Sequence, residues 1–185
     1  MTGELEALAG KLARVTVQIR NGREGAGCGI IWGSNGLIIS NAHVARSRFL
    51  EIELSDGRVL DGRVWSRDPQ SDLAAIMIAA SGLPMPETAD VGMLRPGEIV
   101  VALGHPFGLA NALALGVVHQ VDADSGRNRW IRADIRLAPG NSGGPLATVG
   151  GEVIGINTLI AGGLAHAIPV AGVRRFVREI GARAA

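Results

Sequence analysis

The sequence predicts an all-β fold built from two six-stranded antiparallel β-barrels, with a short helix at each end of the chain. Short apolar runs recur along most of its 185 residues, and tight turns rich in glycine, which contributes 27 residues, separate them. About six such runs lie on each side of a connector at residues 81–86, which contains two prolines and a glycine. Many short strands at this spacing form a sandwich or barrels, and two halves of about six strands favour two barrels.

The N-terminal part of the chain changes from helical to strand periodicity. Leu5, Leu8 and Leu12 recur at helical spacing, which predicts an amphipathic helix over residues 1–12. The first barrel is expected over residues 13–82, because apolar residues then alternate with polar ones. Its strands are predicted at residues 15–20, 28–32, 37–40, 50–54, 59–65 and 73–78.

The second half again consists of short apolar runs separated by turns, without an obvious sequence repeat of the first half. A second barrel is therefore expected over residues 83–168. A C-terminal helix is predicted over residues 169–185, because Pro169 suits a first helical turn and Val173, Phe176 and Ile180 recur on one face. The strands of the second barrel are predicted at residues 99–103, 113–121, 130–135, 146–149, 153–157 and 165–168.

Composition limits the partners that the chain is expected to have. The formal net charge is +1, the basic residues are scattered along the sequence and aromatic residues make up 3%, so no nucleic-acid partner is expected. No apolar run is long enough for a membrane segment. The N-terminal residues do not resemble a signal peptide, so a complete chain would be cytoplasmic. If a leader or anchor was removed, a periplasmic or other extracytoplasmic location fits equally well.

The segment PGNSGGPL, residues 139–146, carries the strongest signal for catalysis. A serine hydroxyl becomes an effective nucleophile when a base accepts its proton and N–H donors stabilise the charge on the carbonyl oxygen. Glycines around Ser142 let the N–H groups of Gly140 and Ser142 turn toward one point, as an oxyanion hole requires. By itself the segment is also consistent with an ordinary serine in a glycine-rich turn.

Two other kinds of site fit the sequence less well. The pattern Gly-x-Ser-x-Gly also occurs in α/β-hydrolases, but there a helix follows the serine directly, and Gly143-Gly144-Pro145 is a poor helix start. A zinc site could be imagined from His105, His119 and His166, but their spacing matches no known ligand pattern, so no metal is expected.

Two further residues precede Ser142 in an order typical of acyl-transfer enzymes. His43 follows a predicted strand, and Asp72 stands directly before another. Taken singly, such a histidine is usually structural or solvated, and such an aspartate usually caps a turn. The conjunction is more informative, because the order His, Asp, Ser with a Gly-x-Ser segment matches one known arrangement of a catalytic triad.

Six short segments occur in order along the chain: SNAHV, SDLAAI, ALGHPFGL, APGNSGGPL, VIGINT and AHAIPV. Together they resemble the HtrA (DegP-like) family of trypsin-like serine proteases over about residues 13–182. The resemblance implies two perpendicular barrels with an active site in the cleft between them. It implies that His43 is the general base, that Asp72 orients it and that Ser142 attacks. Gly140 and Ser142 would supply the oxyanion N–H groups, with Asn141 in the same loop, and no cofactor would be needed.

The same resemblance implies a polypeptide substrate. Residues 155–158 are similar to the strand that pairs with substrate backbone, which favours extended or unfolded polypeptides and makes Ile156, Asn157 and Thr158 substrate-binding residues. Arg136 and His166 depart from the residues usual around the specificity pocket. We hypothesise that one or both give the pocket a polar or basic character; the alternative is that Arg136 points to solvent or to Asp134.

Other departures concern regulation and assembly. The resemblance covers only the protease region, so peptide sensing through a PDZ domain is not expected of these residues. The N-terminal segment lacks the aromatic residues that often join family trimers, so the trimer that the resemblance implies is in doubt. Cys28 is the only cysteine, which excludes an internal disulfide and predicts a buried structural thiol. The function expected is a regulated serine endopeptidase. The alternatives are a peptide-binding or signalling module on a protease fold and a subunit that a partner chain completes.

Overall fold

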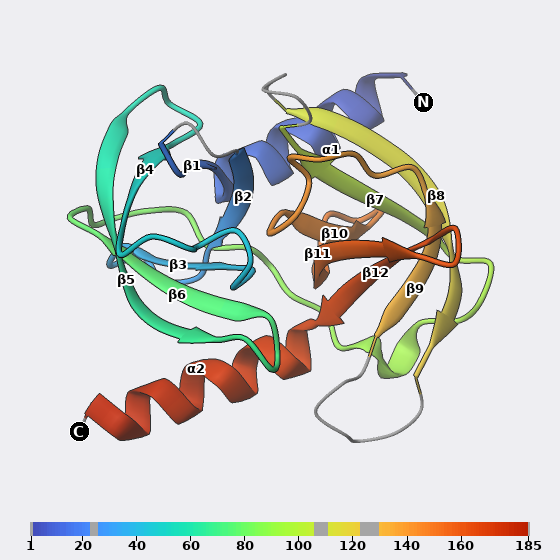
Figure 1. Ribbon diagram of the computed structural model, residues 1–185. Coiled ribbons are helices and arrows are strands. Elements are labelled where there is room, and N and C mark those ends of the chain that lie inside the picture. The colour runs from blue at the N-terminus through green and yellow to red at the C-terminus, as the bar shows by residue number, and fades with distance from the viewer. Residues whose placement is uncertain (1, 23–25, 106–110, 123–129, 185) are drawn as a thin grey trace.

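The computed structural model describes residues 2–22, 26–105, 111–122 and 130–184. Within these ranges the strands form two closed six-stranded antiparallel barrels that lie side by side, as Figure 1 shows, and the predicted fold class is confirmed. The chain completes one barrel before it begins the other, so each barrel is a continuous stretch of sequence.

The first barrel has the strand order β1-β2-β3-β6-β5-β4, and pairing of β1 with β4 closes it. Alternation explains the shorter strands: in β4 the side chains of Leu50 and Ile52 are buried, while those of Phe49 and Glu51 are exposed. The strands are β1 (Thr16–Arg20), β2 (Ala26–Ile31), β3 (Leu37–Ser40), β4 (Phe49–Glu53), β5 (Val59–Asp68) and β6 (Leu73–Ile78).

The second barrel has the order β7-β8-β9-β12-β11-β10, and pairing of β7 with β10 closes it. Strand for strand, this is the order of the first barrel, although no sequence repeat relates the two halves. The strands are β7 (Ile99–Gly104), β8 (Ala112–Val121), β9 (Ile131–Ile135), β10 (Pro145–Thr148), β11 (Val153–Ala161) and β12 (Leu164–Pro169).

One helix lies at each end of the chain, α1 (Thr2–Val15) and α2 (Val170–Ala184). Helix α1 extends beyond residue 12, where it was expected to end, and includes Val15, which was expected in a strand. The Thr16 hydroxyl donates to the Leu12 carbonyl over 2.8 Å, which continues the helical pattern one turn further. Neither helix, as far as the structure describes them, is long and apolar enough to span a membrane.

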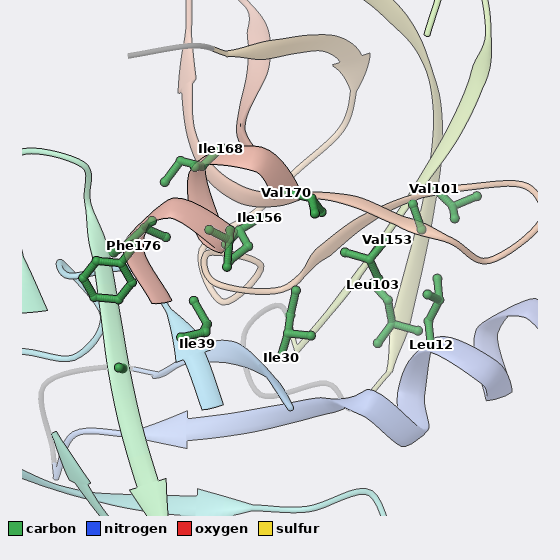
Figure 2. Close-up of a cluster of buried hydrophobic side chains, with 14 of the residues drawn as sticks. Leu12, Ile30, Ile39, Val101, Leu103, Val153, Ile156, Ile168, Val170 and Phe176 are labelled. Carbon is green, nitrogen blue, oxygen red and sulfur yellow. The ribbon is translucent and has the colours of Figure 1, made fainter. Parts of the chain in front are cut away.

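A central cluster of apolar side chains joins both barrels to both helices. Figure 2 shows Leu12 of α1 beside Leu103 of β7, Ile30 and Ile39 of the first barrel near Ile156 of β11, and Phe176 of α2 nearby. Burying one such side chain contributes roughly 1.5–3 kcal/mol. Each barrel also encloses a smaller apolar core of its own. The central cluster fixes the two barrels against each other, and the candidate active site lies where they meet.

Candidate active site

Strand pairing in the first barrel brings His43 and Asp72 together. β3 ends at Ser40, and the turn after it carries His43; β6 begins directly after Asp72. Because β3 and β6 pair with Ser40 opposite Ala74, the two flanking segments lie at the same end of the barrel. The Ala42 N–H donates to the Asp72 carbonyl over 3.1 Å and ties the segments together.

Both carboxylate oxygens of Asp72 engage His43. Oδ2 lies 2.7 Å from His43 Nδ1, and Oδ1 accepts the His43 backbone N–H over 3.0 Å. A carboxylate only accepts hydrogen bonds, so Nδ1 carries the proton and Nε2 keeps its lone pair. This is the tautomer that a general base requires.

Asp72 also has an unusual backbone conformation. Its φ of +51° lies in the left-handed region, which costs a residue other than glycine roughly 1–3 kcal/mol. Aspartate tolerates this region better than most residue types. Its carbonyl accepts the Ala42 N–H and the Asn41 side-chain amide, the latter over 3.0 Å, so three separate hydrogen bonds from the His43 turn hold Asp72 in place.

The loop around Ser142 depends on glycine for steric reasons. Gly140 and Gly143 have φ values of +105° and +85°, which side chains rarely adopt. A Cβ atom on Gly143 would lie 1.9 Å from the Cys28 carbonyl oxygen, much closer than any real contact. This position therefore requires glycine both for its dihedral angle and for the approach of the first barrel.

The first barrel holds this loop through Cys28, a residue of β2. Its backbone N–H donates to the Ser142 carbonyl over 2.7 Å, and its thiol donates to the Gly140 carbonyl over 3.0 Å. Burial raises the pKa of the Cys28 thiol to about 12, so it remains a protonated donor. The His105 N–H donates to the same Gly140 carbonyl over 3.3 Å.

The backbone N–H groups of Gly140 and Ser142 have no hydrogen-bond partner in the part of the chain that the structure describes. The N–H of Asn141, between them, is occupied by the Ala138 carbonyl at 3.0 Å. The Asn141 side chain is buried, and its Oδ1 has no partner among the described residues. Two unoccupied N–H donors beside a serine can bind the oxygen of a reacting carbonyl.

The Ser142 hydroxyl points to a backbone carbonyl in this structure. Its Oγ donates to the Thr158 carbonyl over 3.0 Å, and no hydrogen bond joins Ser142 to His43, both of which the structure describes. Asn41 connects the two halves of the site, because its side-chain amide donates to Thr158 Oγ1 over 3.1 Å as well as to Asp72. This hydroxyl must turn away from the Thr158 carbonyl before it can donate to the imidazole.

The predicted substrate-binding strand is placed differently from what the sequence suggested. Ile156 and Asn157 are buried, and residues 155 and 156 pair with both β10 and β12, so residues 155–157 are flanked on both sides. Beyond a bulge at Thr158, residues 159–161 pair only with β12 within the described ranges. By backbone pairing the open edge is therefore residues 158–161, although the side chain of Thr158 is itself buried. The position of this open edge is set by the register of the strands, which cannot be read from the sequence motif.

Arg136 and His166 occupy separate positions. Arg136 is exposed directly after β9 and forms no ion pair with Asp134, which is also described. His166 is half-buried on β12, opposite Arg132, with its ring centroid 5.6 Å from that of Trp130. Burial lowers the pKa of His166, and the charge of Arg132 acts in the same direction. Asp72 contacts His43 directly, and Asn41 links their turns to Thr158, the residue that Ser142 binds, whereas Arg136 lies on the surface.

Sequence reasoning missed the structural part of the site. Cys28, Asn41 and Thr158 connect the loops that carry the three candidate catalytic residues, yet none stood out for that role. Gly143 was the available signal, since a glycine beside a nucleophile often marks a close backbone approach. Within the described residues, no group of three or more His, Cys, Asp or Glu side chains could hold a metal ion.

Comparison with known proteins adds to this geometry. A model of the trypsin-like peptidase domain matches residues 27–156. A protein of Synechocystis sp. named as serine protease HhoB is 39% identical over 158 residues, 80% of this chain and 38% of its own length. "Serine protease HTRA1" of Xenopus laevis is 40% identical over 83% of this chain and 36% of its own. "Serine protease HTRA2, mitochondrial" of Drosophila pseudoobscura pseudoobscura is 38% identical over 85% of this chain and 39% of its own. The chain thus spans less than half the length of these relatives.

Proposed function

Because this chain belongs to the trypsin-like peptidase family, with serine proteases of the HtrA group as relatives, we propose that it is a serine endopeptidase. Its substrates are polypeptides in extended or unfolded form. The observation that carries this proposal is the junction of the barrels, where a histidine bonded to an aspartate lies on one side and a glycine-bounded serine on the other, with two N–H donors that have no partner among the described residues.

The proposed reaction begins when Ser142 rotates toward His43. Oγ attacks the substrate carbonyl while Nε2 of His43 accepts its proton, and Asp72 stabilises the imidazolium that forms. His43 then donates this proton to the leaving amine as the C–N bond breaks. A water molecule, activated by the same imidazole, hydrolyses the acyl-enzyme and restores Ser142.

The oxyanion of each tetrahedral intermediate is stabilised by the N–H groups of Gly140 and Ser142. One donor of this kind commonly changes kcat by about 10²–10³-fold. The Cys28 and His105 bonds to the Gly140 carbonyl hold this part of the loop before substrate arrives. The site thus has its donors positioned while its nucleophile points elsewhere.

The Ser142–Thr158 hydrogen bond supports a resting form of the enzyme. A substrate strand that pairs with the open edge at residues 158–161 would offer an N–H to the Thr158 carbonyl. That contact competes with the Ser142 hydroxyl and releases it toward His43. Occupation of the edge and activation of the nucleophile are thereby coupled.

Labelling with a fluorophosphonate probe tests the proposal without knowledge of the cleavage site. Labelling of the wild-type chain that disappears in Ser142→Ala and His43→Ala supports it. Ser55→Ala, an exposed turn serine, is the matched control and should label normally. Loss of either catalytic residue from a working triad lowers turnover on the order of a millionfold. A folded wild-type chain that never labels, even with an extended peptide present, would falsify the proposal.

The second candidate function is a peptide-binding or signalling module. The direction of the Ser142 hydroxyl favours it over a constitutively active enzyme. Such a module binds extended peptides but forms no acyl-enzyme with any of them. A chain completed by a partner is distinguished by labelling that appears only when that partner is added.

We also propose that the chain forms a homo-oligomer. Ile99 and Val117 are cross-strand neighbours on β7 and β8, Leu115 stands two residues from Val117, and all three side chains are exposed. An apolar patch of this kind is typical of contacts between subunits. Sedimentation equilibrium of wild type and Leu115→Glu tests the proposal, including the trimer that the family resemblance implies. A monomer at every concentration contradicts it.

A further inference from the structure

A group of exposed arginine and aromatic side chains lies on the first barrel next to the turn of His43. We call it the arginine–aromatic surface, and it consists of Arg46, Arg48, Phe49, Arg63, Trp65 and Arg67. Phe49 and Trp65 keep 66% and 47% of their surface exposed, which is unusual for large aromatic side chains. These residues belong to two short stretches of sequence, 46–49 and 63–67. The stretches lie side by side because β4 pairs antiparallel with β5.

Strand pairing makes this surface continuous. Phe49 of β4 lies directly opposite Arg63 of β5, and both project from the outer face of the barrel, since their neighbours Leu50 and Gly62 are buried. The Arg48 guanidinium carbon is 5.6 Å from the centre of the Phe49 ring, within range of a cation–π contact. Trp65, two residues after Arg63, occupies a bulge in the pairing of β5 with β6.

The surface is attached to the catalytic turn at one end. Arg46 Nε donates to the His43 carbonyl over 2.8 Å, and Arg67 Nε donates to the Ala42 carbonyl, also over 2.8 Å. Each guanidinium has five N–H donors, so these single bonds leave most of its hydrogen-bonding capacity unused. The arginine–aromatic surface therefore adjoins the turn that carries the candidate base.

The charge of this surface is unbalanced. None of its four arginines forms an ion pair with a carboxylate in the part of the chain that the structure describes. Arg20, by contrast, bridges Glu51 and Glu53 on the same sheet, and Arg58 pairs with Asp56. Structural arginines in this barrel are neutralised locally, whereas those beside His43 are not.

From this arrangement we infer that the arginine–aromatic surface is an exosite for an acidic segment of the polypeptide substrate. The inference rests on the proposed endopeptidase function and specifies its substrate class: chains in which Asp or Glu residues, with interspersed apolar ones, lie near the cleaved bond. Guanidinium groups bind carboxylates in a planar, two-bond geometry, and Phe49 and Trp65 contact the apolar residues.

The neighbouring charges favour a short acidic peptide over other anionic partners. Glu51 and Asp61 are directly opposite each other at the next outward-facing positions of β4 and β5. Glu51 is paired with Arg20, but Asp61 forms no ion pair within the described residues. Its charge limits the basic surface to a short stretch and repels the continuous charge of a nucleic acid or an anionic membrane that would extend across it.

Binding to the inactive Ser142→Ala protein tests the exosite without turnover. Two peptides share one sequence of small apolar residues and carry, on either side of it, an Asp/Glu tract or the matching Asn/Gln tract. We expect the acidic peptide to bind at least about tenfold more tightly by fluorescence anisotropy. Each exposed arginine–carboxylate pair changes the affinity by only a few-fold. Reversing two charges with Arg48→Glu and Arg63→Glu should therefore remove most of the preference for the acidic peptide. Raising the salt concentration should weaken it too.

A matched double variant separates the exosite from overall charge. Arg58→Glu with Arg178→Glu makes the same change of charge at exposed positions outside the arginine–aromatic surface. This variant should keep the preference for the acidic peptide. In the active enzyme, Arg48→Glu with Arg63→Glu should raise KM for the acidic peptide about tenfold, with kcat unchanged. The neutral peptide should keep its kcat/KM within about twofold. Arg48→Gln with Arg63→Gln provides a milder pair if the charge reversal impairs folding.

The two proposals fail in distinguishable ways. Selective binding of the acidic peptide by a chain that never cleaves it contradicts the endopeptidase and supports the exosite. Cleavage with equal affinity for both peptides overturns the exosite alone, as does an equal loss of affinity in the control double variant. Tighter binding at this surface of oligo(dT), or of phosphatidylcholine vesicles containing phosphatidylserine, also overturns it.

Discussion

The two barrels share one strand order, yet they hold their catalytic groups in different ways. The first barrel positions the base by itself: every hydrogen bond that holds Asp72 against His43 comes from residues 41–43. The second barrel presents the nucleophile on a glycine loop that is held both by its own barrel, through His105 and Asn157, and by Cys28 of the first barrel. The base is thus a local structure, whereas the nucleophile loop also depends on how the barrels dock.

Because of this difference, substitutions in the two halves of the site should affect catalysis and stability to different extents. Changes in the base half should remove catalysis and leave the fold, because its strained Asp72 is surrounded by surface turns. Changes in the nucleophile loop should disturb the contact between barrels together with the active site, because the loop lies against β2 and the central cluster. Four substitutions or conditions test this contrast, and they are ordered by expected free-energy effect.

The largest effect is expected for Asp72→Asn. Asparagine tolerates the left-handed φ and fits the same space, but its amide cannot stabilise an imidazolium and favours the wrong tautomer of His43. We expect kcat to fall by roughly 10⁴-fold, with an unfolding midpoint in urea close to wild type. Asp61→Asn, at an exposed position on β5, should leave kcat unchanged. A variant that retained a tenth of the activity would contradict the role of Asp72.

The next effect distinguishes two glycines with the same backbone angle. Gly143 and Gly57 have φ values of +85° and +84°, but a Cβ on Gly57 meets nothing within 4 Å, whereas one on Gly143 meets the Cys28 carbonyl. Gly57→Ala should cost only the conformational strain, about 1–2 kcal/mol in free energy of unfolding. Gly143→Ala should cost about 4 kcal/mol or more and abolish probe labelling. Equal losses in guanidinium unfolding would show that the barrels adjust without cost.

A smaller effect is expected when the Cys28 thiol is removed. Cys28→Ala deletes one donor to the Gly140 carbonyl and leaves a small cavity, at a cost of about 1–3 kcal/mol. Cys28→Ser keeps a hydroxyl donor and should label faster with the fluorophosphonate than Cys28→Ala does. In the wild type, Cys28 should react with a disulfide reagent only on unfolding, because it is buried and its pKa is about 12. Equal labelling rates in all three proteins would exclude a positioning role for the thiol.

The sequence predicts the local parts of this structure well. Alternating apolar residues and glycine turns locate the strands, and the motif order gives candidate catalytic residues, of which His43 and Asp72 are in contact. What it misses is set by pairing between distant segments. The open edge lies at residues 158–161 because β10 covers the preceding residues, and the arginines gather because β4 pairs with β5. Neither register is encoded in a local pattern.

The same limit applies to the direction of individual side chains. The position of Ser142 follows from its motif, but its bond to the Thr158 carbonyl depends on a rotamer and on Asn41, which links two loops from different barrels. The hypothesis that Arg136, His166 or both give the specificity pocket a polar or basic character stays a prediction, because it depends on where these side chains point; Arg136 is exposed and His166 is half-buried.

The smallest expected effect is a dependence of stability on pH through His105, which supports the nucleophile loop but not the base. Burial lowers its pKa below the ordinary value of 6.5, opposed by Glu53 and assisted by Arg20. The unfolded chain therefore binds a proton more readily, so this stabilisation is complete above about pH 6.5 and is lost as the pH falls toward the lower folded value. Each unit of difference in pKa corresponds to about 1.4 kcal/mol.

Urea unfolding between about pH 8 and pH 5 measures this loss, and His105→Gln should flatten the profile below pH 6.5. His166→Gln provides the comparison, because burial lowers the pKa of His166 as well, but that residue lies on β12, away from the Gly140 loop. Protonation of His105 weakens a segment whose backbone donates to Gly140, so the probe-labelling rate of wild type should fall with stability, and that of His105→Gln less. A profile that stays unchanged in His105→Gln would show that protonation of this histidine is not what weakens the loop at low pH.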